Sequence, residues 1–170
     1  MTIRYSLIIF AISILPGCKM PSADKYVDTV KPAITVDSSQ YQIAEPLLLS
    51  AFEMRDDSIF KDGSIPVKWE NAGFTDVKGF KLFLKQLQLW VRDNNKEELA
   101  NVIRYPLKNV SSRAQLMQSY DAIFTKPVKL SFATINFSQI FRNSQGAMTE
   151  SGLVWFRQLG DSFRIIAVNN

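Results

Sequence analysis

FKLFLKQLQLWV, residues 80–91, is the stretch of sequence that decides the fold. Its apolar residues recur at offsets 0, 3, 4, 7, 10 and 11, which is the spacing of one helix face: Phe80, Phe83, Leu84, Leu87, Trp90 and Val91. The lysines around them are assigned to the polar face: Lys78, Lys81 and Lys85. Thr75 suits the N-cap and Asp76 the first turn. We therefore predict a helix of about four turns with one buried face.

Two shorter helices are expected after this one. Residues 96–104 would bury Leu99, Val102 and Ile103, and Pro106 would stop the helix. Residues 112–124, capped by Ser111 or Ser112, form the third helix, with an apolar stripe of Leu116, Met117, Tyr120, Ile123 and Phe124.

After Pro127 the residue pattern is typical of β-strands. We predict strands at residues 128–137, 138–142, 147–159 and 162–168, with turns at 143–146 and at Gly160-Asp161. The long strand would carry a bulge near Ser151-Gly152. Three helices followed by antiparallel strands predict an α+β fold, with the three helices packed on one face of a curved antiparallel sheet.

The part that precedes the long helix has a weaker pattern. Residues 45–54 fit a short helix with Pro46 in its first turn, or a buried strand. Residues 65–69 fit an edge strand because they contain Pro66. Asp56-Asp57 and residues 61–64 are interpreted as solvated turns, since their spacing lacks the pattern of a calcium loop.

The N-terminal residues predict a secretory leader: Arg4, an apolar run over residues 5–15, and Pro16-Gly17 before Cys18. Leu15 to Cys18 resembles the lipobox of bacterial lipoproteins, whose cysteine is acylated after cleavage. The resemblance implies a signal peptide at 1–17, a lipidated tether at 18–36, and a lipid bilayer as partner through acylated Cys18. Because Lys19 rather than aspartate follows the cysteine, the resemblance also implies a periplasm-facing protein anchored in the outer membrane.

Residue content limits the chemistry. Removing 17 of the 170 residues leaves 153, enough for one domain, and the loss of Arg4 lowers the formal net charge from +4 to +3. The basic residues form no patch, so we expect no nucleic-acid partner. The chain has no histidine and one cysteine, which removes the commonest general base, the usual nucleophile pairs and most zinc sites. We expect no metal and no cofactor.

The order of elements over residues 74–170 resembles the nuclear transport factor 2-like superfamily, in its uncharacterised envelope branch. The residues that carry the resemblance are Leu89-Trp90-Val91, residues 103–107 and 120–124, Gln145-Gly146 and Trp155-Phe156. It implies a cone with a hollow interior, preceded by an N-terminal embellishment at 37–73. Relatives that dimerise through the open sheet face make a homodimer an expectation by analogy.

The candidate site residues are Cys18 for lipidation and an aromatic pocket of Trp90, Tyr105 and Trp155, with Tyr120-Asp121 as a proton-transfer pair. Aromatic residues line ligand cavities, but most belong to the core. Adjacent helix residues point about 100° apart, so we favour a core Tyr120 and a solvated Asp121 over a shared site. We assign no catalytic residue.

Three functions follow in order of preference. The first is a non-catalytic binding module, for instance an immunity or inhibitor lipoprotein directed at an envelope protein. The second is a small-ligand carrier or sensor that uses the cone pocket. The third is an acid–base enzyme that works without histidine.

Overall fold

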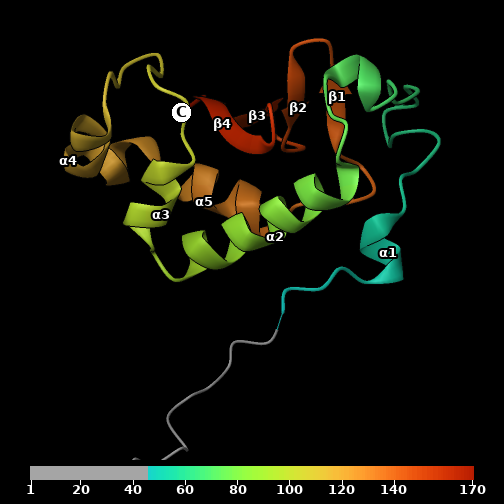
Figure 1. Cartoon of the computed structure of the whole chain (residues 1–170), viewed down its shortest axis with the longest axis horizontal. Helices are drawn as coiled ribbons and strands as arrows, with labels where there is room; N and C mark the ends of the chain where they lie inside the picture. The colour runs from blue at the N-terminus through green and yellow to red at the C-terminus, as the bar shows by residue number, and fades with distance from the viewer. Residues whose placement is uncertain (1–45) are drawn as a thin grey trace, which may run out of the picture. The chain divides into compact units, whose positions relative to one another are not determined.

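The computed structural model describes residues 46–170, and over these residues the fold is α+β (Figure 1). The described part holds five α-helices, one 3-10 helix and one antiparallel sheet of order β1-β2-β3-β4. The helices are α1 (Ala51–Met54), η2 (Glu70–Ala72), α2 (Val77–Arg92), α3 (Lys96–Asn101), α4 (Arg113–Ile123) and α5 (Lys126–Ala133). The strands are β1 (Phe141–Asn143), β2 (Gly146–Met148), β3 (Val154–Leu159) and β4 (Ser162–Val168). The predicted leader, Cys18 and the tether lie outside the described residues.

Helix α2 confirms the four-turn prediction. Phe80, Leu84, Leu87 and Val91 are buried along one face. The N-cap is Asp76 rather than Thr75, because the Asp76 carboxylate accepts a hydrogen bond from the Gly79 N–H at 2.8 Å. Within residues 46–170, no helix has the length and hydropathy needed to cross a bilayer.

The second predicted helix ends early, at Asn101. Residues 102–104 extend along the free edge of β4 instead: Ile165 N–H donates to Val102 O at 2.9 Å and Arg104 N–H donates to Ile165 O at 2.8 Å. This pairing covers a sheet edge that would otherwise be open. Helix α4 begins at the predicted cap, since the Ser112 hydroxyl accepts from the Gln115 N–H.

The predicted strand at residues 128–137 is wrong, because helix α5 occupies most of it. Val128, Ser131 and Phe132 are buried, which is helical spacing, and Pro127 lies in the first turn, where proline is tolerated. The spacing of Val128, Leu130 and Phe132 suited a strand equally well. Packing decides between the two, since the Phe132 ring lies 6.3 Å from that of Phe156.

The predicted sheet needs two further corrections. The strand expected at 138–142 begins only at Phe141, and the long strand expected at 147–159 is two strands separated by a turn, in which Gly152 N–H donates to Thr149 O at 2.8 Å. The hairpin at Gly160-Asp161 and the last strand are confirmed. Gly146 has a φ of 136°, and a Cβ there would lie 2.2 Å from Phe156 O, so this turn requires glycine.

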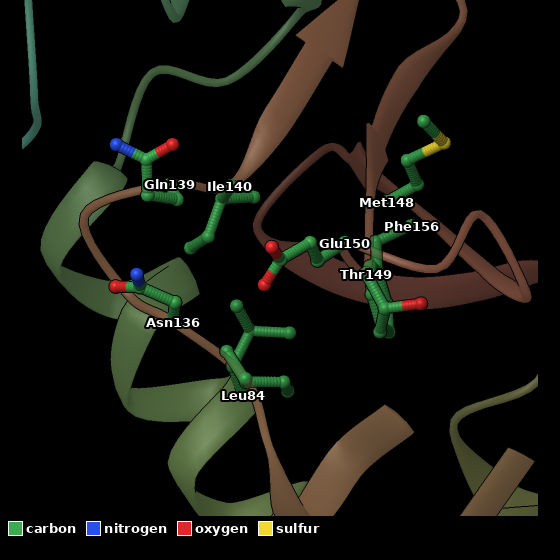
Figure 2. A pocket seen from close by; sticks show the side chains of 9 residues that line it. Leu84, Asn136, Gln139, Ile140, Met148, Thr149, Glu150 and Phe156 are labelled. Carbon is green, nitrogen blue, oxygen red and sulfur yellow. The ribbon is translucent and has the colours of Figure 1, made fainter. Parts of the chain in front are cut away.

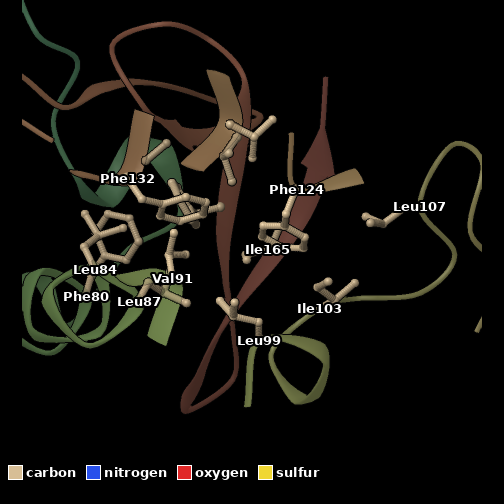
Figure 3. Packing of buried hydrophobic residues seen from close by; sticks show 14 of the residues in the cluster. Phe80, Leu84, Leu87, Val91, Leu99, Ile103, Leu107, Phe124, Phe132 and Ile165 are labelled. Atoms are coloured by element: carbon tan, nitrogen blue, oxygen red, sulfur yellow. The ribbon is translucent and has the colours of Figure 1, made fainter. Parts of the chain in front are cut away.

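Helices α2 and α5 cover one face of the sheet, on one side of β3 and β4 (Figure 1). Ile165 points from the sheet into this layer, where Phe80 and Phe132 are also buried (Figure 3). Phe156 is buried in the same cluster. The rings of Phe80 and Phe156 lie 5.8 Å apart. Leu87 and Ile165 are both fully buried, and for Leu87 this confirms the predicted core face of the helix.

Residues 46–69, which we call the arm, do not form the predicted edge strand at 65–69, and their only helix is the four-residue α1. Helix α2 holds the arm through Lys81, whose side chain is fully buried rather than on the polar face as predicted. Its ammonium group donates to Asp56 Oδ1 at 2.8 Å and to three successive carbonyls of the arm: Glu53 (2.9 Å), Met54 (3.2 Å) and Arg55 (2.9 Å).

Asp56 is the second half of this anchor, and not the solvated turn residue that was predicted. Its Oδ2 accepts from Trp69 Nε1 and from Arg142 Nη2, the latter at 3.2 Å. Arg142 is buried, stacks at 4.1 Å over the Trp69 ring and donates to Val67 O at 2.6 Å. These groups join the arm, helix α2 and strand β1, and each buried charge among them is paired.

Candidate functional site

The face of the sheet opposite the helices, which we call the outer face, carries an apolar row across all four strands. Directly opposed residues of antiparallel strands point to the same face. Phe141 pairs with Met148, Met148 with Trp155, and Trp155 with Ala167. Each of these residues is half-buried. A sheet with one solvated face normally shows polar residues there, so an apolar row marks this face as a candidate binding surface.

A β-bulge widens the row at its β4 end. The register shifts by one residue between Trp155, which pairs with Ala167, and Phe156, which pairs with Ile165. Ile166 is the extra residue, and it lines the same hollow as Ala167 and Trp155. The bulge therefore brings two adjacent β4 side chains to the outer face, where strict alternation would have placed one.

This end of the outer face is a shallow, open hollow of about 510 Å³. Its lining residues are Ser144, Gln145, Trp155, Arg157, Ile166, Ala167 and Asn169. No carboxylate is among them, and Arg157 forms no ion pair within residues 46–170. The Arg157 guanidinium makes one long contact, 3.5 Å from Nη2 to Ser144 O, so most of its donors are free for a ligand. Tryptophan and arginine together are the residues most enriched at binding hot spots.

The other end of the outer face has a second hollow, of about 300 Å³, between β1, β2 and the arm. Phe60, Phe141 and Met148 form its apolar part, and the rings of Phe60 and Phe141 lie 6.2 Å apart. A salt bridge of 3.1 Å between Lys61 and Glu150 lies at its rim. Asp62 also lines this hollow and pairs with no cation in the described residues, so this end carries an excess of negative charge, in contrast to the arginine end.

The inner face holds no ligand-sized space at the pocket shown in Figure 2. Leu84, Ile140 and Phe156 line it with Asn136, Gln139 and Glu150, and its free volume is about 10 Å³. That is room for about one water molecule. Within residues 46–170, no cluster of three or more carboxylate, cysteine or histidine groups is placed to hold a metal ion.

The predicted pocket residues do not share one of these hollows; only Trp155 lines any of them. Trp90 is half-buried against the core, and Tyr105 is half-buried with its hydroxyl donating to Ala100 O at 3.2 Å. The structure separates Tyr120 from Asp121 as the helix geometry indicated, with Tyr120 in the core and the Asp121 carboxylate exposed.

Tyr120 and Asp121 have opposite electrostatic surroundings. Burial, with a smaller effect of the Asp121 charge, raises the pKa of Tyr120 to about 12, and its hydroxyl has no hydrogen-bond partner in the described part of the chain. Hydrogen bonds from Lys129 (3.2 Å) and Lys96 (3.3 Å) lower the pKa of Asp121. A phenol that stays protonated and a carboxylate that stays ionised and outside make a poor proton-transfer pair.

Arg157 and Ile166 are the site residues that sequence reasoning missed. Ile166 was missed because the position of a β-bulge cannot be recognised from the alternation of polar and apolar residues in the sequence. Arg157 carried a usable signal, since it lies two residues from Trp155 in a predicted strand and so shares its face. Comparisons of this chain with protein-family models, curated proteins and solved structures give no match.

Proposed function

We propose that this chain is a lipid-anchored, periplasm-facing protein that acts as a non-catalytic binding module, with the outer sheet face as its binding surface. One observation carries the proposal: the apolar row spans all four strands and ends in a hollow where Trp155 and Ile166 lie beside Arg157, with no carboxylate in the lining. The partner that fits is a protein with an acidic surface next to an apolar side chain. An immunity or inhibitor protein directed at an envelope protein would bind its target through a surface of this kind.

A small-ligand carrier or sensor is the second candidate. It needs an enclosed cavity, and the inner pocket holds about 10 Å³. The outer hollows are larger but open, so they would leave much of a small ligand in water. An acid–base enzyme is the least supported reading, because the chain has no histidine and the Tyr120-Asp121 pair is divided between core and surface.

The resemblance to the nuclear transport factor 2-like superfamily belongs with this proposal. Helices packed on one face of an antiparallel sheet are compatible with it in outline. A homodimer through the open sheet face, as in relatives of that superfamily, would use the same outer face and is therefore the main competitor of a foreign partner.

The lipid anchor rests on Arg4, the apolar run of residues 5–15 and the lipobox-like end at Cys18. It is tested by Cys18→Ser in cells labelled with palmitate. We expect loss of the label and release of the protein from the outer-membrane fraction, as follows from anchoring by acyl chains. Retention in the membrane with an unchanged label would contradict the anchor.

The binding surface is tested by photo-crosslinking in the source cells. A photoreactive amino acid replaces Ile166 in the hollow or, as a control, Leu130, which is 58% exposed on α5. We expect an adduct with an acidic protein from position 166 and none from position 130.

Charge variants complete this test. The adduct should be lost with Arg157→Glu and kept with Lys126→Glu, which changes the net charge equally at an exposed site on α5. An adduct of twice the protein's mass would identify a homodimer instead. Equal adducts from positions 166 and 130, or an adduct that survives Arg157→Glu, would contradict the proposed surface.

A further inference from the structure

The arm carries most of the exposed large apolar side chains of the described residues. Of the eight that are exposed in residues 46–170, six lie between positions 48 and 67: Leu48, Phe52, Met54, Ile59, Ile65 and Val67. Leu48, Phe52 and Ile65 are 71%, 65% and 79% exposed. Scattered exposed apolar residues need no explanation, but a concentration of this kind in one short segment does.

Three of the four carboxylates of the arm are turned toward the domain, which inverts its polarity relative to an ordinary surface segment; the fourth, Asp62, is exposed and binds Ser64 of its own turn. Glu53 binds Lys85 of α2 at 2.9 Å, and Asp56 is held by Lys81 and Arg142. Asp57 accepts from the Ser138 hydroxyl at 2.9 Å and from the Gln139 amide. These contacts fix the arm against α2 and the segment before β1, so its apolar side chains are held outward.

The charges left on the outside of the arm include two cations. Arg55 and Lys68 are exposed and form no ion pair within the described part of the chain. Apolar side chains together with cations are what a protein presents to the interface of a bilayer that contains anionic lipid.

The position of the arm in the chain indicates which surface it meets. The described residues begin at Pro46, two positions before Leu48, and 27 residues, 19–45, lie between Cys18 and Pro46. Even fully extended, 27 residues reach only about 90–100 Å. A domain anchored at Cys18 would therefore stay close to the bilayer, at an effective concentration on the order of millimolar for any surface that binds lipid.

We infer that the arm is a second, reversible membrane contact, which lays Leu48, Phe52 and Ile65 into the headgroup region while Cys18 supplies the lasting attachment. The inference rests on the proposed lipid anchor. It goes beyond that proposal because it assigns a bilayer-facing side to the domain itself. The arginine end of the outer face, which no arm residue lines, is then left for the partner.

Depth measurements on the lipidated protein test this contact. Cys18 is the only cysteine and its thiol would carry lipid, so a cysteine introduced by Phe52→Cys, Ile65→Cys or, as a control, Leu130→Cys takes a nitroxide label at one place. Each labelled protein is reconstituted into vesicles of phosphatidylethanolamine and phosphatidylglycerol, and its collision rates with oxygen and with a water-soluble nickel complex are measured. All three sites are exposed, so the substitutions should leave the fold intact.

We expect the oxygen-to-nickel ratio at positions 52 and 65 to exceed that at position 130 by about threefold or more, as for side chains about 5–10 Å deep in the interface. Equal ratios at the three positions on vesicle-bound protein would overturn the membrane contact and leave the anchor standing. So would a loss of both collision rates at 52 or 65, which would indicate a protein in contact. If the unsubstituted chain takes the label at Cys18 and does not bind vesicles, the anchor itself fails.

Discussion

Replacing Asp56 with alanine is expected to destabilise the domain by about 3 kcal/mol, because two buried cations lose the one carboxylate that pairs with them within residues 46–170. The Lys81 ammonium lies 2.8 Å from Asp56 Oδ1 and Arg142 Nη2 lies 3.2 Å from Oδ2. The side chain of Lys81 is fully buried and that of Arg142 is 5% exposed.

The magnitude follows from the burial of these charges. Removing one partner of a buried ion pair costs about 3–5 kcal/mol, since the remaining charge stays out of water. The Asp56 carboxylate is 26% exposed and water screens part of the interaction, which places the expected loss at the lower end. Lys81→Met should cost less, about 1–3 kcal/mol, because Asp56 keeps Arg142 and Trp69 and the freed arm carbonyls can bind water.

Lys85 is the matched control. It lies one turn after Lys81 on the same helix and also pairs with a carboxylate of the arm, Glu53, but its side chain is 28% exposed. Lys85→Met should cost about 1 kcal/mol, less than Asp56→Ala, because both side chains of this pair keep some contact with water. The double variant of Asp56→Ala and Lys81→Met should cost less than the sum of its parts by about 1–3 kcal/mol.

The assay is urea unfolding at neutral pH, followed by far-UV circular dichroism so that changes around Trp69 do not distort the signal. Midpoint and slope are compared across the variants. A loss for Asp56→Ala no larger than that for Lys85→Met would refute the reasoning, because it would mean that burial does not set the strength of these pairs. Additive costs in the double variant would refute the coupling.

Three further predictions concern single residues. Leu87→Ala should cost about 2–5 kcal/mol in thermal or urea unfolding, because the side chain is fully buried, whereas Leu130→Ala on the exposed side of α5 should cost almost nothing. Tyr120→Phe should be neutral or stabilising by up to about 1 kcal/mol, because it removes a buried hydroxyl that has no partner in the described residues; a loss above that would reveal a hidden partner. Hydrogen bonds from Lys85 and then Ser50 lower the pKa of Glu53 from 4.5 to about 2, so its contribution to stability is complete above pH 4.5 and is lost as the pH falls toward 2. Glu53→Gln should flatten the pH dependence of stability in that interval, and an unchanged slope would contradict the assignment.

Residue spacing and turn residues predicted correctly those elements whose sequence pattern fits only one type of secondary structure. The spacing of Phe80, Leu84 and Leu87 fits only a helix, and Gly160-Asp161 between two apolar runs fits only a tight turn. The apolar residues of 128–137 fitted the spacing of a helix and that of a strand equally well, so the contact of Phe132 with Phe156 decided that a helix forms. The burial of Lys81 also escaped prediction, because its partners lie more than 20 residues away in the chain.

The candidate site was harder to predict than the fold, because contacts between segments far apart in the chain form it. Trp155 was identified from its residue type, but the hollow around it exists because a bulge in β4 turns Ile166 and Ala167 to one face. Bulge position depends on how two strands pair, which no single strand encodes.

The sequence by itself determined the α+β class, the main helix, the final hairpin and the exclusion of histidine chemistry, because these follow from local periodicity, turn residues and residue content. Only the tertiary structure decided which face of the sheet stays open, how the arm is fixed and where the charged side chains are buried. Those features come from contacts between segments far apart in the chain, and the free energy of a buried charge or an apolar face depends on the partner that it meets there.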